Sequence, residues 1–183
     1  SILGIWAALT GGWIDQVLSR FVDALMAIPA LIFSLLLLTI FGTSVTALIL
    51  VIAAVDATRV FRLARAVAQG IVVMDYIEAA KLRGETLAYL IFREILPNAR
   101  GPLLVDAMLR VGYAIFAMGT LGFLGLGIPP PSPDWGSMVA KGREFILAGS
   151  PWAALWPSLA IASLVVGLNL LADGIREESM RYQ

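Results

Sequence analysis

The chain has 183 residues, of which 60% are hydrophobic and 14% are charged, and its mean hydropathy is +0.89. Soluble domains are about 45–50% apolar and about 25% charged, so this composition indicates a membrane protein. Thirteen basic and thirteen acidic residues cancel, which leaves no net charge to attract nucleic acid. Because cysteine and histidine are absent from the sequence, disulfides, thiolate nucleophiles, Cys/His zinc sites and serine–histidine pairs are excluded.

The first residues indicate the end of a membrane span. The sequence opens at Ser1 with an apolar stretch over residues 1–14, without an initiator methionine or the basic start of a signal peptide. This stretch is too short to cross a bilayer alone. We therefore expect a partial span at about residues 1–9, and a sequence that is a fragment of a longer transmembrane domain.

The following apolar stretches are typical of helices that cross a membrane. Such a helix needs about 20 mostly apolar residues. Residues 24–55 carry no charge and are too many for one crossing, so we divide them at the turn-like Gly-Thr-Ser of residues 42–44. In lipid the backbone must satisfy its own hydrogen bonds, so the sequence predicts an all-α fold, a polytopic membrane helix bundle. Complete spans are expected at about 24–41, 45–66, 103–127 and 152–173.

The basic residues predict the orientation of these spans. Residues 59–100 contain seven Lys and Arg residues, whereas residues 128–151 contain two. Cytoplasmic loops hold the excess of Lys and Arg. We therefore expect a cytoplasmic region at 67–100 and an outer loop at 128–151.

The cytoplasmic region contains a segment with strong helical character. Residues 75–92 are rich in Ala, Leu, Glu and Lys, which favour helices. Asp75 is expected to cap the start of a helix, and Glu78 to lie in its first turn, where the helix dipole favours a negative charge. Gly84 interrupts the pattern and either caps this helix or permits close approach of another backbone. The prediction is a helix, a glycine turn and a second helix, which is either a docking site or a surface hairpin without a partner.

One motif in this region is shared with a known family. Glu-Ala-Ala at 78–80, Gly84 and Leu96-Pro97 follow one another at the spacing of the EAA motif, and the segment resembles that motif in binding-protein-dependent ABC importer permeases. The stretch 93–98 (REILPN) is similar to the dipeptide/oligopeptide/nickel branch, specifically its C-type permease subunit. Glu94 stands where the motif has isoleucine, and Glu85 where a small residue is usual.

Two further stretches are similar to the same branch. They are FLGLGIPPPSPDWGSM at 123–138 and NLLADGIRE at 169–177. The first predicts a stiff proline loop on the outer face, and the resemblance makes this loop a candidate contact for a solute-binding protein. The residues concerned are Pro129, Pro130, Pro131, Trp135 and Gly136.

The resemblance implies the fold of type I ABC importer permeases, with a cytoplasmic coupling helix that fits a cleft on an ATPase subunit. The implied partners are two ATP-binding subunits or a fused pair, a second homologous permease, an extracytoplasmic solute-binding protein and membrane lipid. The sequence has no phosphate-binding loop, so ATP and Mg²⁺ are expected on the ATPase, with no cofactor, metal site or enzymatic activity in this subunit. The residues expected to contact the ATPase are Glu78, Ala79, Ala80, Gly84, Leu96 and Pro97.

The predicted function is therefore that of a multi-pass permease subunit in the bacterial inner membrane, which moves di- and oligopeptides. The same machinery carrying nickel or another small peptide-like solute is the alternative. A secondary transporter would show an inverted repeat and midplane ionisable residues, and neither is evident. An intramembrane enzyme would need paired carboxylates or a Ser/Lys pair within the spans, and the acids near the spans each have an arginine close by.

Two groups of charges near the spans complete the sequence-based expectations. Asp106 and Arg110 lie one helical turn apart, and they are either a structural pair or part of a translocation path. A stripe of basic residues is expected to contact anionic lipid headgroups, with a role in substrate contact as the alternative, and Asp56 is expected to pair with its first member. This stripe comprises Arg59, Arg62 and Arg65.

Overall fold

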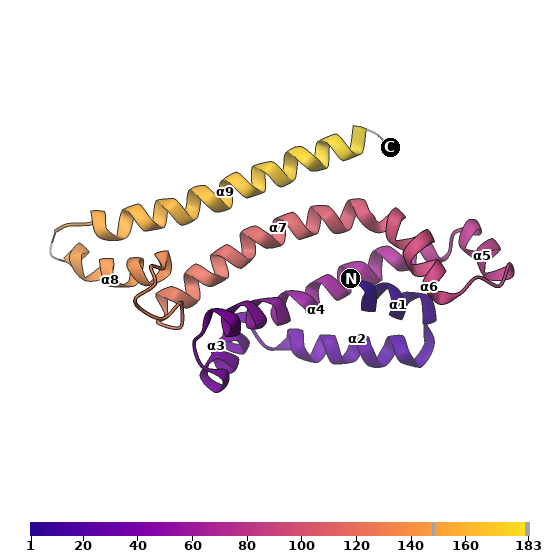
Figure 1. Cartoon of the computed structure of the whole chain (residues 1–183), viewed down its shortest axis with the longest axis horizontal. Helices are drawn as coiled ribbons and strands as arrows, with labels where there is room; N and C mark the ends of the chain where they lie inside the picture. The colour runs from indigo at the N-terminus through magenta and orange to yellow at the C-terminus, as the bar shows by residue number, and fades with distance from the viewer. Residues whose placement is uncertain (148, 182–183) are drawn as a thin grey trace. The chain divides into compact units, whose positions relative to one another are not determined.

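The computed structural model describes residues 1–147 and 149–181, and the regular elements in these ranges are helices (Figure 1). Side chains are described for these residues except those at 147, 176 and 178–181. The all-α prediction is confirmed. The elements are α1 (Ile2–Thr10), α2 (Gly12–Ala27), α3 (Ala30–Phe41), α4 (Val45–Val72), α5 (Asp75–Leu82), α6 (Leu87–Tyr89), the π-helical turn η1 (Leu90–Ile95), α7 (Leu96–Phe123), α8 (Trp135–Leu147) and α9 (Trp152–Arg181).

The single helix expected over residues 24–41 is wrong, because the chain breaks at Ile28 and Pro29. Ile28 is extended, with φ −84° and ψ 126°, and Pro29 has ψ 129°. A residue before proline is disfavoured in the α region, and proline offers no N–H for a helical bond. The next break comes where we placed it, with α3 ending at Phe41 and α4 beginning at Val45.

The helix expected over residues 103–127 begins and ends earlier than predicted. It is continuous over 37 residues from Leu87 to Phe123, and it passes through Pro97 and Pro102. The π-helical turn Leu90–Ile95 lies immediately before Pro97. In such a turn the backbone bonds change partners, which accommodates a residue without an N–H. Pro97 therefore lies within this helix, upstream of the start that we predicted at residue 103.

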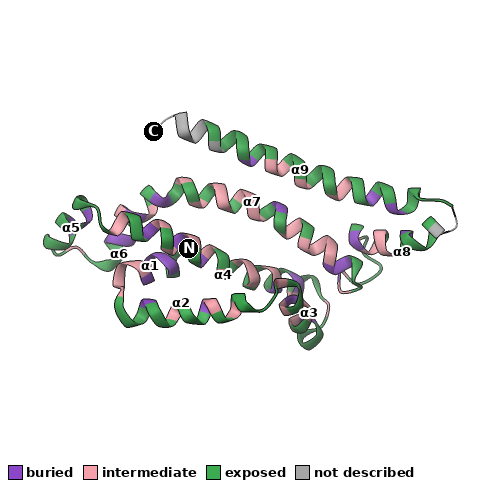
Figure 2. Cartoon of the chain, turned by 180° about the vertical axis from the view of Figure 1, so that it is seen from behind, coloured by how far each residue is buried: buried purple, intermediate pink, exposed green. Residues whose placement is uncertain are grey.

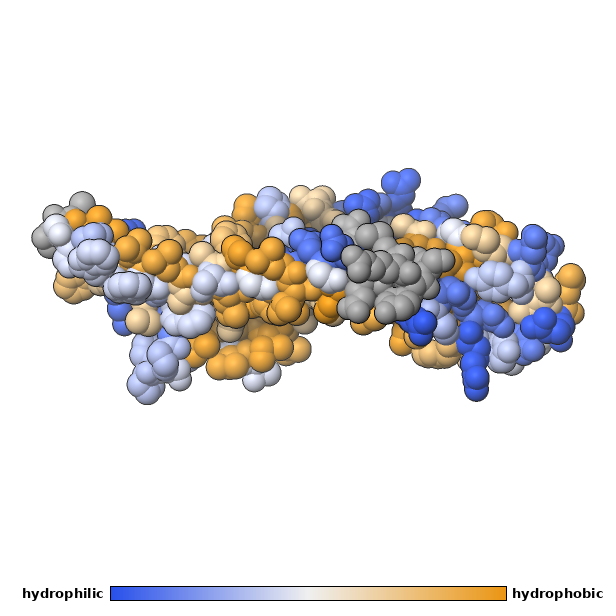
Figure 3. Space-filling view, turned by 90° about the horizontal axis from the view of Figure 1, so that it is seen from above, coloured by the Kyte–Doolittle hydropathy of each residue, from blue (hydrophilic) through white to orange (hydrophobic). Residues whose placement is uncertain are grey.

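Two described helices are long and apolar enough to cross a membrane, Leu87–Phe123 and Trp152–Ile175. The pair α2 and α3 would make a third if the two are counted as one broken span. Helix α4 has 28 residues, but Asp56 lies near its middle and its second half carries three arginines. The five spans read from the sequence thus stay a prediction. Figure 3 shows apolar side chains along α9.

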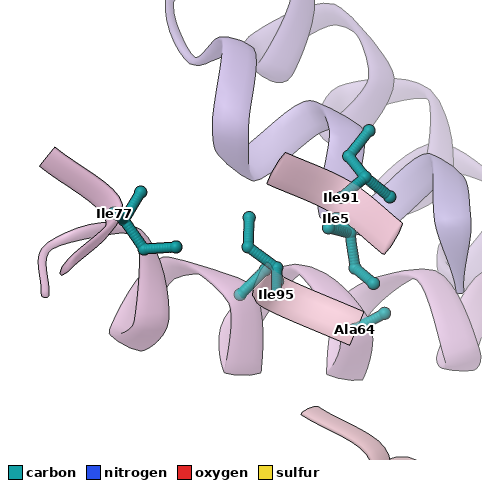
Figure 4. Close-up of a cluster of buried hydrophobic side chains, with 6 residues drawn as sticks. Ile5, Ala64, Ile77, Ile91 and Ile95 are labelled. Atoms are coloured by element: carbon teal, nitrogen blue, oxygen red, sulfur yellow. The ribbon is translucent and has the colours of Figure 1, made fainter. Parts of the chain in front are cut away.

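The described residues form two compact units, each with its own core. The first comprises Ser1–Ile28 and Asp56–Ala107, and the second comprises Pro29–Val55 and the described residues from Met108 onward. The core of the first unit brings together α1, α4, α5 and η1 (Figure 4); its buried residues are Ile5, Ala64, Ala68, Ile77, Ile91 and Ile95. The second unit is centred on Leu38, Leu48, Val51 and Leu121.

Candidate functional site

The candidate site is helix α5 with the turn that follows it. The helix has Asp75 and Glu78 in its first turn and Lys81 in its last, which is the arrangement that the helix dipole favours. The residue at the N-cap position is Met74, which makes no side-chain cap, so the prediction that Asp75 caps the helix is wrong.

The C-terminal end of α5 is a Schellman motif. The Gly84 N–H donates to the Lys81 carbonyl at 3.0 Å, and the Glu85 N–H donates to the Ala80 carbonyl at 3.2 Å. Gly84 has φ 81°, in the left-handed region that this motif requires. A Cβ at Gly84 would meet nothing within 4 Å. Of the two roles considered for this glycine, the structure selects the helix cap, since conformation rather than space demands it.

The two faces of α5 differ sharply in exposure (Figure 2). Ile77 and Ala80 are fully buried, at 0% exposure, whereas Leu82 is 84% exposed and Glu78 and Ala79 are also exposed. Ala80 was predicted beside Ala79 as a surface contact. The structure instead places it on the inner face, because positions 77 and 80 share one side of the helix.

The segment after the turn returns directly to the core. The Thr86 hydroxyl accepts a hydrogen bond from the Tyr89 N–H at 3.2 Å and so caps the long helix that follows. Leu96 is half-buried and Pro97 is exposed. Glu94, which stands at the motif's isoleucine position, is half-buried, while the neighbouring Ile95 is fully buried in the core.

Exposed apolar side chains on both sides of α5 form a feature that sequence reasoning missed. We call these residues the tip surface. Several large apolar side chains exposed together within a short polar segment are typical of an interaction site. The signal was present in the sequence, since Val73-Met74 precedes the acidic start of the helix. The tip surface comprises Val73, Met74, Leu82 and Leu87.

The arginine stripe on α4 is paired with acids. Arg65 holds Asp15 of α2 through two hydrogen bonds of 2.5 and 2.6 Å, and Arg62 lies 3.0 Å from Asp23. Acidic partners on α2 thus contact both guanidinium groups, and the contact of this stripe with lipid headgroups stays a prediction. The predicted pairing of Asp56 with Arg59 is confirmed, at 3.8 Å.

The structure places Asp106 and Arg110 on α7, where both are half-buried. A structural role and a role in a translocation path are both compatible with this position. Among the described residues, no group of three or more Asp or Glu is placed to hold a metal ion.

The loop over residues 128–151, which we predicted to lie on the outer side, contains a helix that the sequence did not predict, α8. Pro129, Pro130 and Pro131 are exposed, as is Trp135 at the first position of α8. Gly136, predicted with them, is buried instead: a Cβ there would lie 2.9 Å from the Phe123 nitrogen of α7. The proline segment and Trp135 thus remain on the surface, while Gly136 serves packing.

Asp134 fixes the start of α8. Its two carboxylate oxygens accept from the Gly136 and Ser137 N–H groups, at 3.3 and 3.0 Å, and the Ser137 hydroxyl donates back to the Asp134 carbonyl at 2.8 Å. This is an N-cap. Gly142, near the middle of α8, packs closely against the start of α9, since a Cβ there would lie 2.6 Å from the Ala154 nitrogen.

Comparison with known proteins assigns the chain to a family. The sequence model described as "Binding-protein-dependent transport system inner membrane component" matches residues 1–177. The chain belongs to this family. The resemblance found in the EAA segment is thereby confirmed, and the chain is an inner membrane transport component.

Several curated relatives are similar over nearly the whole chain. The dipeptide transport system permease protein DppC of Alkalihalophilus pseudofirmus is 37% identical over 175 residues, which are 96% of this chain and 57% of the relative. The probable D,D-dipeptide transport system permease protein DdpC of Escherichia coli is 40% identical over 177 residues, 97% of this chain and 59% of the relative. The glutathione transport system permease protein GsiD of Pectobacterium atrosepticum is 33% identical over 175 residues, 96% of this chain and 58% of the relative. The chain thus spans less than two thirds of the length of these relatives.

Proposed function

We propose that the chain is part of a permease subunit of an ATP-driven importer that carries di- and oligopeptides across the bacterial inner membrane. In this proposal the subunit crosses the membrane several times. It works with a second permease, two ATP-binding subunits or a fused pair, and an extracytoplasmic solute-binding protein. ATP and Mg²⁺ bind the ATPase subunits, and helix α5 is the coupling helix.

The observation that carries this proposal is the division of α5 into an inner and an outer face. Its inner face is locked by Ile77 into a core that also contains Ile5 of α1 and Ala64 of α4. Its outer face leaves Glu78, Ala79 and Leu82 free of contacts that would bury them. A helix that is anchored on one side and open on the other is suited to receive a partner and to transmit its displacement.

The exposed residues define the chemistry of the partner's cleft. Leu82 is 84% exposed, and burying a leucine side chain contributes about 1.5–3 kcal/mol, so it supplies an apolar anchor. The small side chain of Ala79 lets the partner approach the helix closely. The Glu78 carboxylate would accept hydrogen bonds from a basic or amide group. The complementary cleft is therefore apolar, with a donor at its edge.

Coupling also requires that the contact differ between two states of the ATPase. The packing of α5 against α1, α4 and η1 supports this, because movement of the helix cannot be absorbed by a flexible linker. The capped turn at Gly84 connects α5 to the helix Leu87–Phe123, a candidate membrane span. Displacement of α5 would thus reach membrane helices on both sides of it.

The substrate is proposed from the relatives' names. Those relatives are named for dipeptides, D,D-dipeptides and glutathione, all of which are small peptides or peptide-like. Nickel transport by the same machinery is the outcome that uptake assays must distinguish.

The test uses the intact transporter with its neighbouring subunits. Leu82→Asp should abolish co-purification of the ATPase subunits and uptake of a labelled dipeptide, while the amount of permease in the membrane stays unchanged. Leu82→Met, which keeps an apolar side chain of similar volume, should retain both. Normal dipeptide uptake by Leu82→Asp would refute the docking role. Uptake of nickel but of no peptide would refute the proposal that the substrate is a peptide.

A further inference from the structure

The charges between α2 and α4 are arranged in register. Asp15, Ser19 and Asp23 recur at every fourth position of α2, so they share one face of that helix. Opposite them, Arg65 forms a two-bond contact with Asp15, and Arg62 pairs with Asp23 at 3.0 Å. Two carboxylates of α2 thus meet two guanidinium groups of α4 in reversed chain order, as in a pair of antiparallel helices.

The two pairs differ in strength because they differ in exposure to water. The side chains of Asp15 and Arg65 are 12% and 28% exposed, whereas those of Asp23 and Arg62 are 43% and 57% exposed. Water screens the second pair, and exposed pairs contribute little. The Asp15–Arg65 pair is shielded and has the planar two-bond geometry that fixes orientation. Such a pair sets the register of two helices more than it adds stability.

The same part of α4 is in close contact with α1. A Cβ at Gly4 would lie 2.5 Å from the Phe61 carbonyl oxygen and 3.0 Å from the Arg65 nitrogen, so only glycine allows this approach. Phe61 also packs with Ala7 of α1 and Val22 of α2 in a small buried cluster. One stretch of α4, residues 61–65, therefore contacts both α1 and α2.

That stretch continues into the core that holds the coupling helix. Ala64 and Ala68 of α4 lie in the same buried cluster as Ile77 of α5. Helices α1, α2 and α5 are thus all attached to α4 between residues 61 and 68. Helix α5 is attached by apolar packing, and α2 by the small cluster together with the ion pairs.

We propose that Asp15 and Arg65 are positioning residues that fix α2 to α4, the helix against which α5 packs. Displacement of α5 by the ATPase is thereby passed through α4 to α2. The inference rests on the proposed function of α5 as the coupling helix. The ion pair does not touch substrate or nucleotide. It keeps α2 in register with α4 while α4 and α5 move, and it stays closed throughout the transport cycle.

The test is a charge exchange in the intact transporter. The single substitutions Asp15→Asn and Arg65→Gln should each lower peptide uptake by about tenfold, within the usual range of coupling between sites. Co-purification of the ATPase subunits should be unchanged, because α5 keeps its exposed face. The exchange Asp15→Arg with Arg65→Asp should restore uptake. The matched control is Arg59→Gln, whose partner Asp56 lies on the same helix, and it should transport at the wild-type rate.

Wild-type uptake in both single variants would overturn the inference, as would an exchange variant that is present at normal levels yet transports no better than the single variants. Failure of wild-type protein to bind the ATPase would instead refute the proposed function, so the two failures are distinguishable.

A second measurement covers the case in which the single variants do not accumulate. These 183 residues contain no cysteine, so Asp15→Cys with Arg65→Cys provides the one thiol pair among them. Bridging this pair with a short bifunctional thiol reagent should raise uptake toward the wild-type rate, because the contact stays closed while α4 and α5 move. Loss of uptake on bridging would overturn the inference, since it would mean that the two helices must separate.

Discussion

Replacing Ile77 by alanine separates the anchoring of α5 from its docking surface. Ile77 is fully buried among Ile5, Ile91 and Ile95, and its side chain contributes nothing to the exposed face of α5. The substitution leaves the exposed residues unchanged. It should therefore loosen the helix without altering what the ATPase subunit encounters.

The size of the effect follows from the burial of the side chain. Truncating a buried isoleucine to alanine costs about 2–5 kcal/mol, because transfer free energy is lost and a cavity remains. Helix α5 has only eight residues, and short helices depend on packing for their stability. The loss should thus appear in the local opening of α5. A change of 2 kcal/mol corresponds to about a 30-fold change in an equilibrium constant.

Hydrogen exchange of the backbone amides in residues 75–82 measures this opening. Exchange in Ile77→Ala should be about 30-fold faster or more, and uptake should fall relative to ATP hydrolysis. The control is Leu82→Ala, whose side chain is 84% exposed and whose replacement should change stability by no more than about 0.5 kcal/mol. Equal exchange rates in the two variants would refute the claim that Ile77 anchors the helix.

Three further substitutions test the turn after α5 and helix α8. Gly84→Val should cost about 1–2 kcal/mol of local stability, because φ is 81°, and should reduce uptake, whereas Gly84→Asn, which tolerates this conformation, should retain it. Gly142→Ala should lower the thermal unfolding temperature by forcing α8 away from α9, whereas Gly167→Ala, with no atom within 4 Å of the new methyl group, should not. Asp134→Ala should cost about 0.5–2 kcal/mol and speed amide exchange at the start of α8; unchanged exchange would contradict its role as a cap.

The coupling segment was predictable because its signals are local. The helix formers of residues 75–82 and the glycine two positions beyond specify both the helix and its end. The assignment of Ala80 to the surface was wrong for a physical reason. A motif shows which residues matter but not which side of the helix they occupy, and the side is decided by the distant Ile5 and Ala64 that pack against the inner face.

The effect of proline on the helices was predicted wrongly at two positions, once where a helix ends and once where a helix continues. The chain breaks at Pro29 inside the charge-free stretch that we had predicted as one helix. Pro97, by contrast, lies inside a helix whose start we placed several residues later. The difference is in the preceding residues: Ile28 turns extended, while residues 90–95 form a π-helical turn that leads into Pro97. Single-residue preferences do not distinguish these outcomes.

Helix α8 and the α2–α4 ion pairs were missed because their decisive partners are distant in sequence. Asp15 lies 50 residues from Arg65, and spacing within one helix cannot reveal that contact. For α8, one local signal was available, since Asp134 precedes Ser137 at the distance of a helix cap. A short helix within a loop lacks the long apolar stretch by which the spans were recognised.

The location and contact of α5 can be measured directly with one engineered thiol. Because these 183 residues contain no cysteine, Ala79→Cys places the one thiol among them on the exposed face of α5, and the unsubstituted transporter serves as the labelling control. A membrane-impermeant maleimide should label this thiol in inside-out vesicles and not in right-side-out vesicles, and addition of the ATPase subunits should protect it. Labelling from the outer side, or labelling from the cytoplasmic side that the ATPase subunits leave unchanged, would contradict the coupling role of this helix.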